Sequence, residues 1–322
     1  MSLDNQTTCW VVTDGKSGME NQCLGLAEAL GLAPTVKRVK LRFPWRSLTP
    51  FLRAGLGFAF SRGGDPIAPP WPDLVIATGR LSLPAVLYIK RRNPKTFAVQ
   101  LQDPTIDLSK FDLVVAPAHD QLKGPNVMST RGGLHRVTPE MLAREGEKFA
   151  PQVASLRKPY IAVLLGGDSG AYRMTPRAID KFSAQISDGV ITTGGSLLVT
   201  PSRRTGEANL ARFKKAIGNV PAYIWDGQGD NPYYGILALA DYIIVTGDSV
   251  NMVSEACSTG KPVYVIDLPG GSEKFKRFHS ALRKDGMTRL FKGRLERWTY
   301  KPLDDVQAVA NRIKEEFEKQ KS

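Results

Sequence analysis

Residues 241–267 read DYIIVTGDSVNMVSEACSTGKPVYVID, and this stretch sets out one strand–loop–helix–strand unit of the fold. Two apolar runs, 242–246 and 263–266, predict strands, and a loop of small polar residues between them opens a short helix. Free N–H groups at the start of such a helix attract anions. A carboxylate one turn into the helix is placed to meet hydroxyl groups, so the expected ligand is a nucleotide or a sugar. The candidate ligand groups of this stretch are Gly247, Asp248, Ser249, Asn251 and Glu255.

The same alternation of strand and helix continues on both sides of this stretch. Before it, apolar runs predict strands at 9–13, 35–41, 74–77, 96–101, 113–116, 160–165, 196–200 and 222–225. A helix and linker at 140–158 interrupts the pattern, which then restarts. Strands separated by helices of this length imply parallel βαβ units. We therefore expect an α/β chain of two doubly wound, Rossmann-like domains, residues 1–150 and 151–322, with ligands at the carboxyl ends of the strands.

The composition is that of a globular protein. Of the 322 residues, 42% are hydrophobic and 23% are charged, and a chain of this length favours two domains. No apolar run is long enough for a transmembrane helix, and the first ten residues lack a signal-peptide pattern, so we expect a cytoplasmic protein. Cys9, Cys23 and Cys257 show no paired spacing, which favours buried thiols. The three histidines are dispersed, so no metal site is expected.

The net charge of +13 favours anionic partners, namely nucleic acid, acidic membrane surfaces or phosphorylated ligands. No recognition helix, zinc finger or RNA-binding pattern accompanies the basic residues, so no nucleic-acid partner is expected. Residues 43–62, FPWRSLTPFLRAGLGFAFSR, combine aromatic side chains with three arginines. They are interpreted either as a buried helix over the N-terminal sheet or as a segment at a membrane interface, where the arginines meet anionic lipid. The membrane interpretation predicts exposed aromatic side chains.

Three further loops between strand and helix carry ligand-type residues. The first, residues 14–17, is not a P-loop, because Trp10 stands where that motif needs its first glycine. The second contains Gly166, Gly167 and Ser169, and it is not the GxGxxG loop of dinucleotide-binding dehydrogenases; its glycines would let a ligand approach the backbone closely. The third contains Ser202, Arg203 and Arg204, whose guanidinium groups suit a diphosphate. Plain turns and solvated arginines remain the alternatives for all three loops.

These residues together resemble a known family. The run from Thr246 to Ala256, continued by residues 259–264, is similar to the mitochondrial fission (elongated mitochondria) family and its bacterial relatives. Further agreement comes from residues 14–18 with Asn21-Gln22, from Gln102-Asp103-Pro104, from residues 116–120 and from residues 202–205. The family looks like a branch of the GT-B superfamily, which includes nucleotide-sugar glycosyltransferases and UDP-GlcNAc 2-epimerase. The resemblance thus implies two domains facing a cleft, with the final helix, 303–318, returning towards the N-terminal domain.

The resemblance also implies roles for individual residues. In GT-B enzymes the C-terminal domain binds the nucleotide diphospho-sugar donor, so Glu255 would bind the ribose hydroxyls and Ser249 a phosphate. The loop of Gly166, Gly167 and Ser169 would lie near the diphosphate, and residues 225–228, which include Gln228, would lie near the base. The N-terminal loop has no histidine at the position of the transferase base. Asp14 or Asp103 would then deprotonate the acceptor hydroxyl.

The expected function is that of a metal-independent glycosyltransferase that uses a nucleotide diphospho-sugar as substrate and needs no other cofactor. Helix N-termini and Arg203 or Arg204 would stabilise the departing diphosphate. The acceptor is open and includes a lipid-linked one, with peripheral association at an anionic membrane surface. Two alternatives stand beside this function: a non-catalytic adaptor that recruits a protein partner, as implied by the fission family, and a nucleotide-sugar epimerase.

Overall fold

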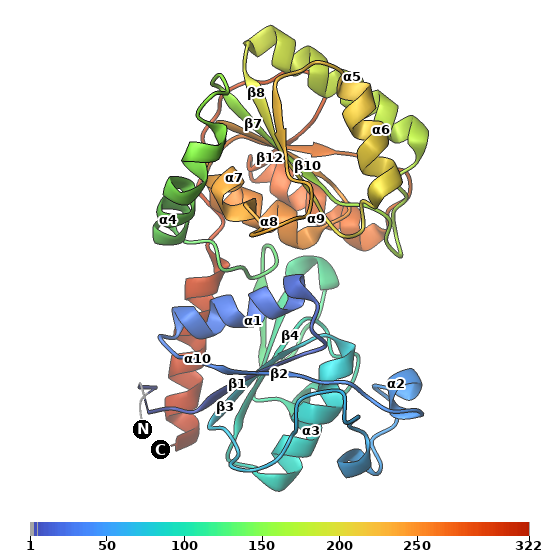
Figure 1. Ribbon diagram of the computed structural model, residues 1–322. Helices are drawn as coiled ribbons and strands as arrows, with labels where there is room; N and C mark the ends of the chain where they lie inside the picture. The colour runs from blue at the N-terminus through green and yellow to red at the C-terminus, as the bar shows by residue number, and fades with distance from the viewer. Residues whose placement is uncertain (1–2, 5, 322) are drawn as a thin grey trace. The chain divides into compact units, whose positions relative to one another are not determined.

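The computed structural model describes residues 3–4 and 6–321, which form two compact α/β units. Unit 1 comprises Met1–Arg136 with Asp304–Ser322, and unit 2 comprises Val137–Leu303. Figure 1 shows the elements of each unit. Each sheet has six strands that pair in parallel. The predicted class of two doubly wound, Rossmann-like units is therefore confirmed.

Unit 1 has the strand order β2-β1-β3-β4-β5-β6. Its central strands are buried on both faces, as expected for a parallel sheet covered by helices. The helices α1 and α10 cover one face and α3 covers the other. The elements are β1 (Cys9–Thr13), α1 (Ser17–Ala29), β2 (Thr35–Arg38), α2 (Trp45–Leu48), β3 (Leu74–Thr78), α3 (Leu83–Arg92), β4 (Phe97–Leu101), β5 (Leu113–Pro117), β6 (Val127–Thr130) and α10 (Asp305–Lys321), with short 3-10 helices η1 (Leu56–Phe58), η2 (Arg80–Ser82), η3 (Leu108–Lys110) and η4 (Ala118–Asp120).

Unit 2 has the strand order β12-β11-β10-β7-β8-β9. The helices α5 and α6 cover one face of this sheet, and α4, α7, α8 and α9 cover the other. The elements are α4 (Pro139–Phe149), η5 (Ala150–Val153), β7 (Tyr160–Leu165), α5 (Pro176–Thr193), β8 (Ser196–Pro201), α6 (Glu207–Ile217), β9 (Ala222–Ile224), α7 (Tyr233–Leu239), β10 (Tyr242–Thr246), α8 (Val250–Ser258), β11 (Val263–Ile266), α9 (Glu273–Lys284) and β12 (Thr288–Leu290).

The boundary between the units lies at residues 136 and 137, earlier than the expected 150 and 151. The reason is that α4 packs inside unit 2. The ring of Phe149 meets that of Tyr223 edge-on at 5.0 Å, and Gly146 allows α4 to approach Ala238 on α7. The helix α10 belongs to unit 1, where it contacts α1 and crosses it at a steep angle (Figure 1), and where Phe317 packs on Phe97.

The interpretation of residues 43–62 as a buried helix is wrong. The segment contains only the four-residue helix α2 and the short η1, and four of its large apolar side chains are exposed. A regular helix is prevented by Pro50, Gly55 and Gly57, since proline removes a backbone donor and glycine weakens helices.

Candidate functional site

The loops that follow β7, β8 and β10 meet at the carboxyl edge of the unit 2 sheet. β7 pairs with β10 on one side and with β8 on the other, and the three strands run parallel. The strand order changes direction between β7 and β10, which is where doubly wound folds place their ligands. The loop after β10, which contains Asp248, therefore lies at this switch point, next to the glycine loop.

The carboxylate of Asp248 links these loops. One of its oxygens, Oδ2, accepts a hydrogen bond from the Gly167 N–H at 3.1 Å and lies 2.6 Å from a guanidinium nitrogen of Arg204. The same guanidinium donates to the carbonyl oxygens of Gly167 and Asp168. The Asp248 side chain has no exposed surface, and its Oδ1 has no hydrogen-bond partner among the described residues. The anion on the glycine loop in this structure is thus the protein's own carboxylate.

The two glycines before Asp168 are required by close packing. A Cβ atom on Gly166 would lie 2.1 Å from Asp248 Oδ1, and one on Gly167 would lie 2.0 Å from the carbonyl oxygen of Arg204. The Gly166 N–H also donates to Thr246 Oγ1 at 2.7 Å, which joins the end of β7 to the end of β10. The close approach that the sequence predicted at these glycines is, in this structure, that of Asp248 and Arg204.

Glu255 lies on α8 with its carboxyl group buried. Its Oε2 accepts a hydrogen bond of 2.5 Å from the hydroxyl of Tyr233, at the start of α7. Burial raises the pKa of Glu255 to about 7, because the charged form loses its hydration, and the Tyr233 hydrogen bond opposes part of this rise. Among the described residues no lysine, arginine or histidine pairs with it. A buried acid at a strand–helix edge without a counter-ion is a candidate functional group.

Ser249 is the N-cap of α8. Its hydroxyl accepts a hydrogen bond from the Met252 N–H at 3.3 Å, as a capping serine does. Asn251 is half-buried in the first turn of the same helix. The preceding turn is held by His279, whose Nε2 lies 2.8 Å from the Gly247 carbonyl oxygen and therefore carries the proton; burial lowers the pKa of His279, which favours this neutral form.

The remaining predicted groups of unit 2 lie in neighbouring loops. Arg203 is exposed and pairs with no described residue, in contrast to Arg204. The Ser202 hydroxyl accepts from the Arg204 N–H at 3.2 Å, and the Ser169 hydroxyl accepts from the N–H groups of residues 171 and 172, so both stabilise their loops. Gln228 lies in the exposed turn after β9, where its backbone carbonyl oxygen accepts a hydrogen bond from the indole N–H of Trp225.

The two candidate bases lie in unit 1, after β1 and β4. The Asp14 carboxylate pairs with the Lys16 ammonium at 2.6 Å, and the Asp14 side chain is mostly buried. Asp103 is exposed and accepts the Thr105 N–H at 2.7 Å. The strand β3 lies between β1 and β4, so these carboxylates follow strands that are not neighbours. A further acid near Asp14 is Glu20, in the first turn of α1; it forms two hydrogen bonds with Arg38, and this partner lowers its pKa.

Sequence reasoning missed Tyr233, Thr246 and His279 as parts of this site. Tyr233 comes directly after the polar turn that follows β9, and that position was its only signal. His279 lies 32 residues after the glycine it contacts, on a helix that the sequence analysis did not predict.

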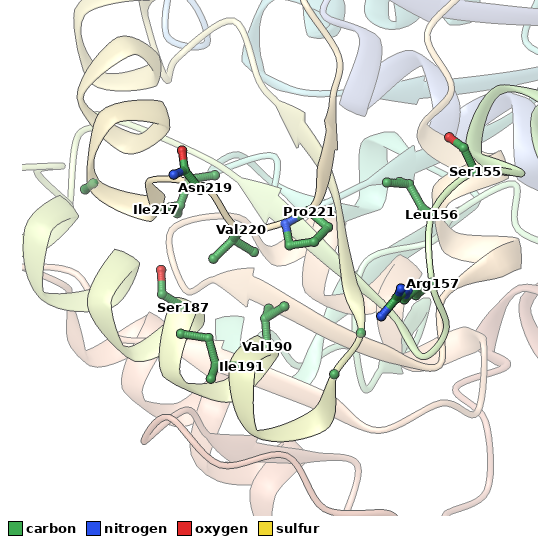
Figure 2. A pocket seen from close by; sticks show the side chains of 13 residues that line it. Ser155, Leu156, Arg157, Ser187, Val190, Ile191, Ile217, Asn219, Val220 and Pro221 are labelled. Carbon is green, nitrogen blue, oxygen red and sulfur yellow. The ribbon is translucent and has the colours of Figure 1, made fainter.

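A large open pocket of unit 2 lies elsewhere. It has a volume of about 720 Å³ and is lined by Val190 and Ile191 of α5 and by residues before β7, β8 and β9, including Arg157, Gly195 and Pro221. Figure 2 shows these side chains around it. Arg157, Gly195 and Pro221 each precede a strand, so this pocket lies at the amino edge of the sheet. The Asp248 loop and the helix α8 that carries Glu255 follow the opposite, carboxyl edge.

Within residues 3–4 and 6–321, no three His, Cys, Asp or Glu side chains cluster in a way that could hold a metal ion. Over the same residues, no helix has the length and apolar character needed to cross a membrane.

Comparisons with known proteins agree with the fold and with the sequence resemblance. The protein titled "Mitochondrial fission protein ELM1" from Arabidopsis thaliana is 31% identical over 394 residues, covering 95% of this chain and 90% of the plant protein. A putative UDP-N-acetylglucosamine 2-epimerase from Listeria monocytogenes has a TM-score of 0.57 at 14% identity over 95% of both chains. The Neisseria meningitidis UDP-GlcNAc 2-epimerase, solved with UDP-GlcNAc bound, has a TM-score of 0.51 at 13% identity over 97% of this chain and 93% of its own.

At identities this low the two solved structures establish the fold, which is GT-B-like, and nothing finer. The family follows from the sequence. The family profile described as "Mitochondrial fission ELM1" matches residues 17–317, which is most of the chain. Together with the Arabidopsis relative, this match shows that the chain belongs to the mitochondrial fission ELM1 family.

Proposed function

We propose that the carboxyl edge of unit 2 binds a nucleotide diphospho-sugar and that the protein transfers the sugar to an acceptor. The observation that carries this proposal is Glu255, a buried carboxylate to which, among the described residues, only the Tyr233 hydroxyl donates a hydrogen bond. Its remaining acceptor positions suit the two hydroxyl groups of a ribose. The Neisseria relative in fold was solved with a ligand of this class, UDP-GlcNAc.

The other groups follow from their place around α8. The N–H groups that open α8 beside Ser249, together with the exposed guanidinium of Arg203, would stabilise the diphosphate and its negative charge on departure. Gln228 and the indole of Trp225 would lie towards the base. In unit 1, Asp14 or Asp103 would accept the proton of the acceptor hydroxyl. The acceptor proposed here includes one carried by a membrane lipid.

The first test is calorimetric titration with UDP, GDP and CMP nucleotides and with the corresponding nucleotide sugars. Binding of at least one of them is expected. If none binds, or if Glu255→Ala binds as tightly as the unmodified protein, the donor site is not where we place it. Release of sugar or of an epimerised nucleotide sugar without any acceptor would instead favour the epimerase alternative. An adaptor would bind none of these ligands.

Binding of the nucleotide sugar should depend on pH. Ribose hydroxyls donate to the ionised form of Glu255, whose pKa of about 7 leaves little of this form at pH 6. We therefore expect affinity to rise about tenfold from pH 6 to pH 8, in proportion to the ionised fraction. A diphospho-diester ligand does not titrate in this range, so the change reports the protein. Glu255→Gln should bind more weakly and show no such dependence; an unchanged slope in this variant would remove Glu255 from the site.

Arg203 and Arg204 should differ in what they do. Arg203→Ala removes a charge that pairs with no described residue, so stability should stay constant while nucleotide-sugar affinity falls about tenfold. Lys214→Ala, an equally exposed cation in the last turn of α6, is the matched control and should bind normally. Arg204→Ala should lower the melting temperature, because it leaves the Asp248 carboxylate buried without its counter-ion. Equal affinities of the Arg203 and Lys214 variants would contradict the diphosphate role.

A further inference from the structure

Unit 1 exposes a group of large apolar side chains within a single short segment. Phe43 is 83% exposed, Phe51 78%, Phe58 76% and Leu48 51%. We call the three phenylalanines, together with Leu48, the aromatic patch. Among the described residues, only one other large hydrophobic side chain is comparably exposed, Ile191 of unit 2 at 73%. Large apolar side chains that are exposed within one short segment are typical of an interaction site.

The patch is presented by a folded segment. Leu41 pairs with Phe60 in an antiparallel bridge, and two residues of the segment itself, Leu56 and Ala59, are buried. The indole N–H of Trp45 donates to the Ala54 carbonyl oxygen at 2.8 Å. Arg91 of α3 donates to the Arg53 carbonyl oxygen at 3.0 Å, which ties the segment to the rest of the unit. The patch side chains are thus held outward by contacts that the segment makes with its other residues.

The sequence around the patch carries charges of a single sign. No acidic residue occurs between Glu28 and Asp65, whereas seven basic ones do: Lys37, Arg38, Lys40, Arg42, Arg46, Arg53 and Arg62. Arg42, Arg46 and Arg62 are exposed, and none of them forms an ion pair with a described residue. In Figure 1, α2, which lies within this segment, is found at the outer margin of unit 1.

We propose that the aromatic patch docks unit 1 onto an anionic phospholipid bilayer. Phenylalanine side chains that project from a surface enter the boundary between headgroups and acyl chains, and arginines beside them pair with lipid phosphates. A protein partner would have to supply separate pockets for the projecting rings together with an acidic rim. A bilayer accepts projecting rings without shape matching, and its lipid phosphates supply the negative charge. The observations therefore favour lipid. The proposal stands independently of the nucleotide site, which belongs to unit 2.

The test is flotation of the full chain with phosphatidylcholine vesicles that contain or lack phosphatidylserine. The unmodified protein should float with the anionic vesicles and remain unbound with the neutral ones. The triple change Phe43→Ser, Phe51→Ser and Phe58→Ser should lower the vesicle partition coefficient at least about a hundredfold. Ile191→Ser is the matched control for an exposed apolar side chain and should float as the unmodified protein does.

A second set of variants tests the charges. Arg42→Gln, Arg46→Gln and Arg62→Gln together should weaken flotation and reduce its dependence on salt. The same number of exposed lysines changed to glutamine in unit 2, at positions 214, 215 and 284, should have a smaller effect. Unchanged melting temperatures and nucleotide binding would show that both sets remain folded. Absence of flotation by the unmodified protein, or equal flotation of the triple phenylalanine variant, would overturn the proposal and leave the patch to a protein partner.

Discussion

Glu255→Gln should raise the free energy of unfolding at pH 8 by about 3 kcal/mol. The pKa of Glu255 rises from its ordinary value of 4.5 to about 7 in the folded protein, because the carboxylate is buried. Folding therefore favours the protonated acid. The stability that this group contributes is complete below about pH 4.5 and is lost as the pH rises through 7, at about 1.4 kcal/mol per pH unit. Glutamine keeps the shape and an acceptor for the Tyr233 hydroxyl without ionising, so the variant avoids this loss.

The measurement is urea unfolding of both proteins at pH 5 and pH 8. The stability difference should be small at pH 5 and close to its full value at pH 8. Glu147→Gln, an exposed position on α4 of the same unit, should show no such gain at either pH. A difference that does not change with pH would mean that Glu255 is ionised in the folded protein throughout this range.

The sign of this effect separates two roles for Glu255. A residue kept for stability loses stability when it is replaced, whereas a residue kept for ligand binding can gain it. Glu255→Gln is expected to be more stable and at the same time to bind nucleotide sugar more weakly. That combination would be hard to explain for a solvated helix residue.

The interior of the fold could be predicted from the sequence because parallel strands buried on both faces appear as continuous apolar runs. β10 was predicted with the bounds it has, 242–246. β6 and β12 were missed, since edge strands such as VMST and TRL have no apolar run to reveal them. The helix α9 was also missed, because lysines and arginines interrupt its apolar face, on which Phe278 and Leu282 are buried.

The position of the site was predictable and its internal pairing was not. Loops that follow parallel strands must meet at one edge, so the Gly166 and Asp248 loops could be brought together from topology alone. The Asp248–Arg204 ion pair joins residues 44 positions apart, and the Tyr233–Glu255 hydrogen bond joins residues 22 positions apart. No local pattern records either pair, because each depends on the side-chain directions that the complete sheet imposes.

Gly167→Ala should destabilise unit 2 by about 3 kcal/mol or more, the upper range for inserting a group into a packed site. The added Cβ would meet the Arg204 carbonyl oxygen at 2.0 Å and the Thr205 nitrogen at 2.6 Å. Both are backbone atoms, so the contact can be relieved only by moving the loop between β8 and α6. That movement would also separate Arg204 from Asp248, which depend on the same loop.

The matched control lies three residues away in the same loop. Apart from its two chain neighbours, no described residue has an atom within 4 Å of the Gly170 Cβ position, and its φ is not positive, so Gly170→Ala should change stability by less than about 0.5 kcal/mol. Gly166→Ala provides a second contrast, because its clash is with the Asp248 side chain at 2.1 Å. Asp248→Ala should relieve part of the cost at Gly166 and none of the steric cost at Gly167, which a double-mutant cycle measures.

Thermal unfolding and nucleotide-sugar titration of these variants decide what the glycines do. If they serve close packing, Gly167→Ala loses stability whether or not ligand is present. If they serve the approach of a diphosphate, Gly167→Ala should instead melt like Gly170→Ala and lose affinity alone. In that case the Asp248 carboxylate would have to leave the Gly167 N–H when the ligand arrives, since one N–H group cannot serve both anions fully. We expect Gly167→Ala to lose stability with or without ligand, because the Asp248 carboxylate is fully buried and is already paired with Arg204.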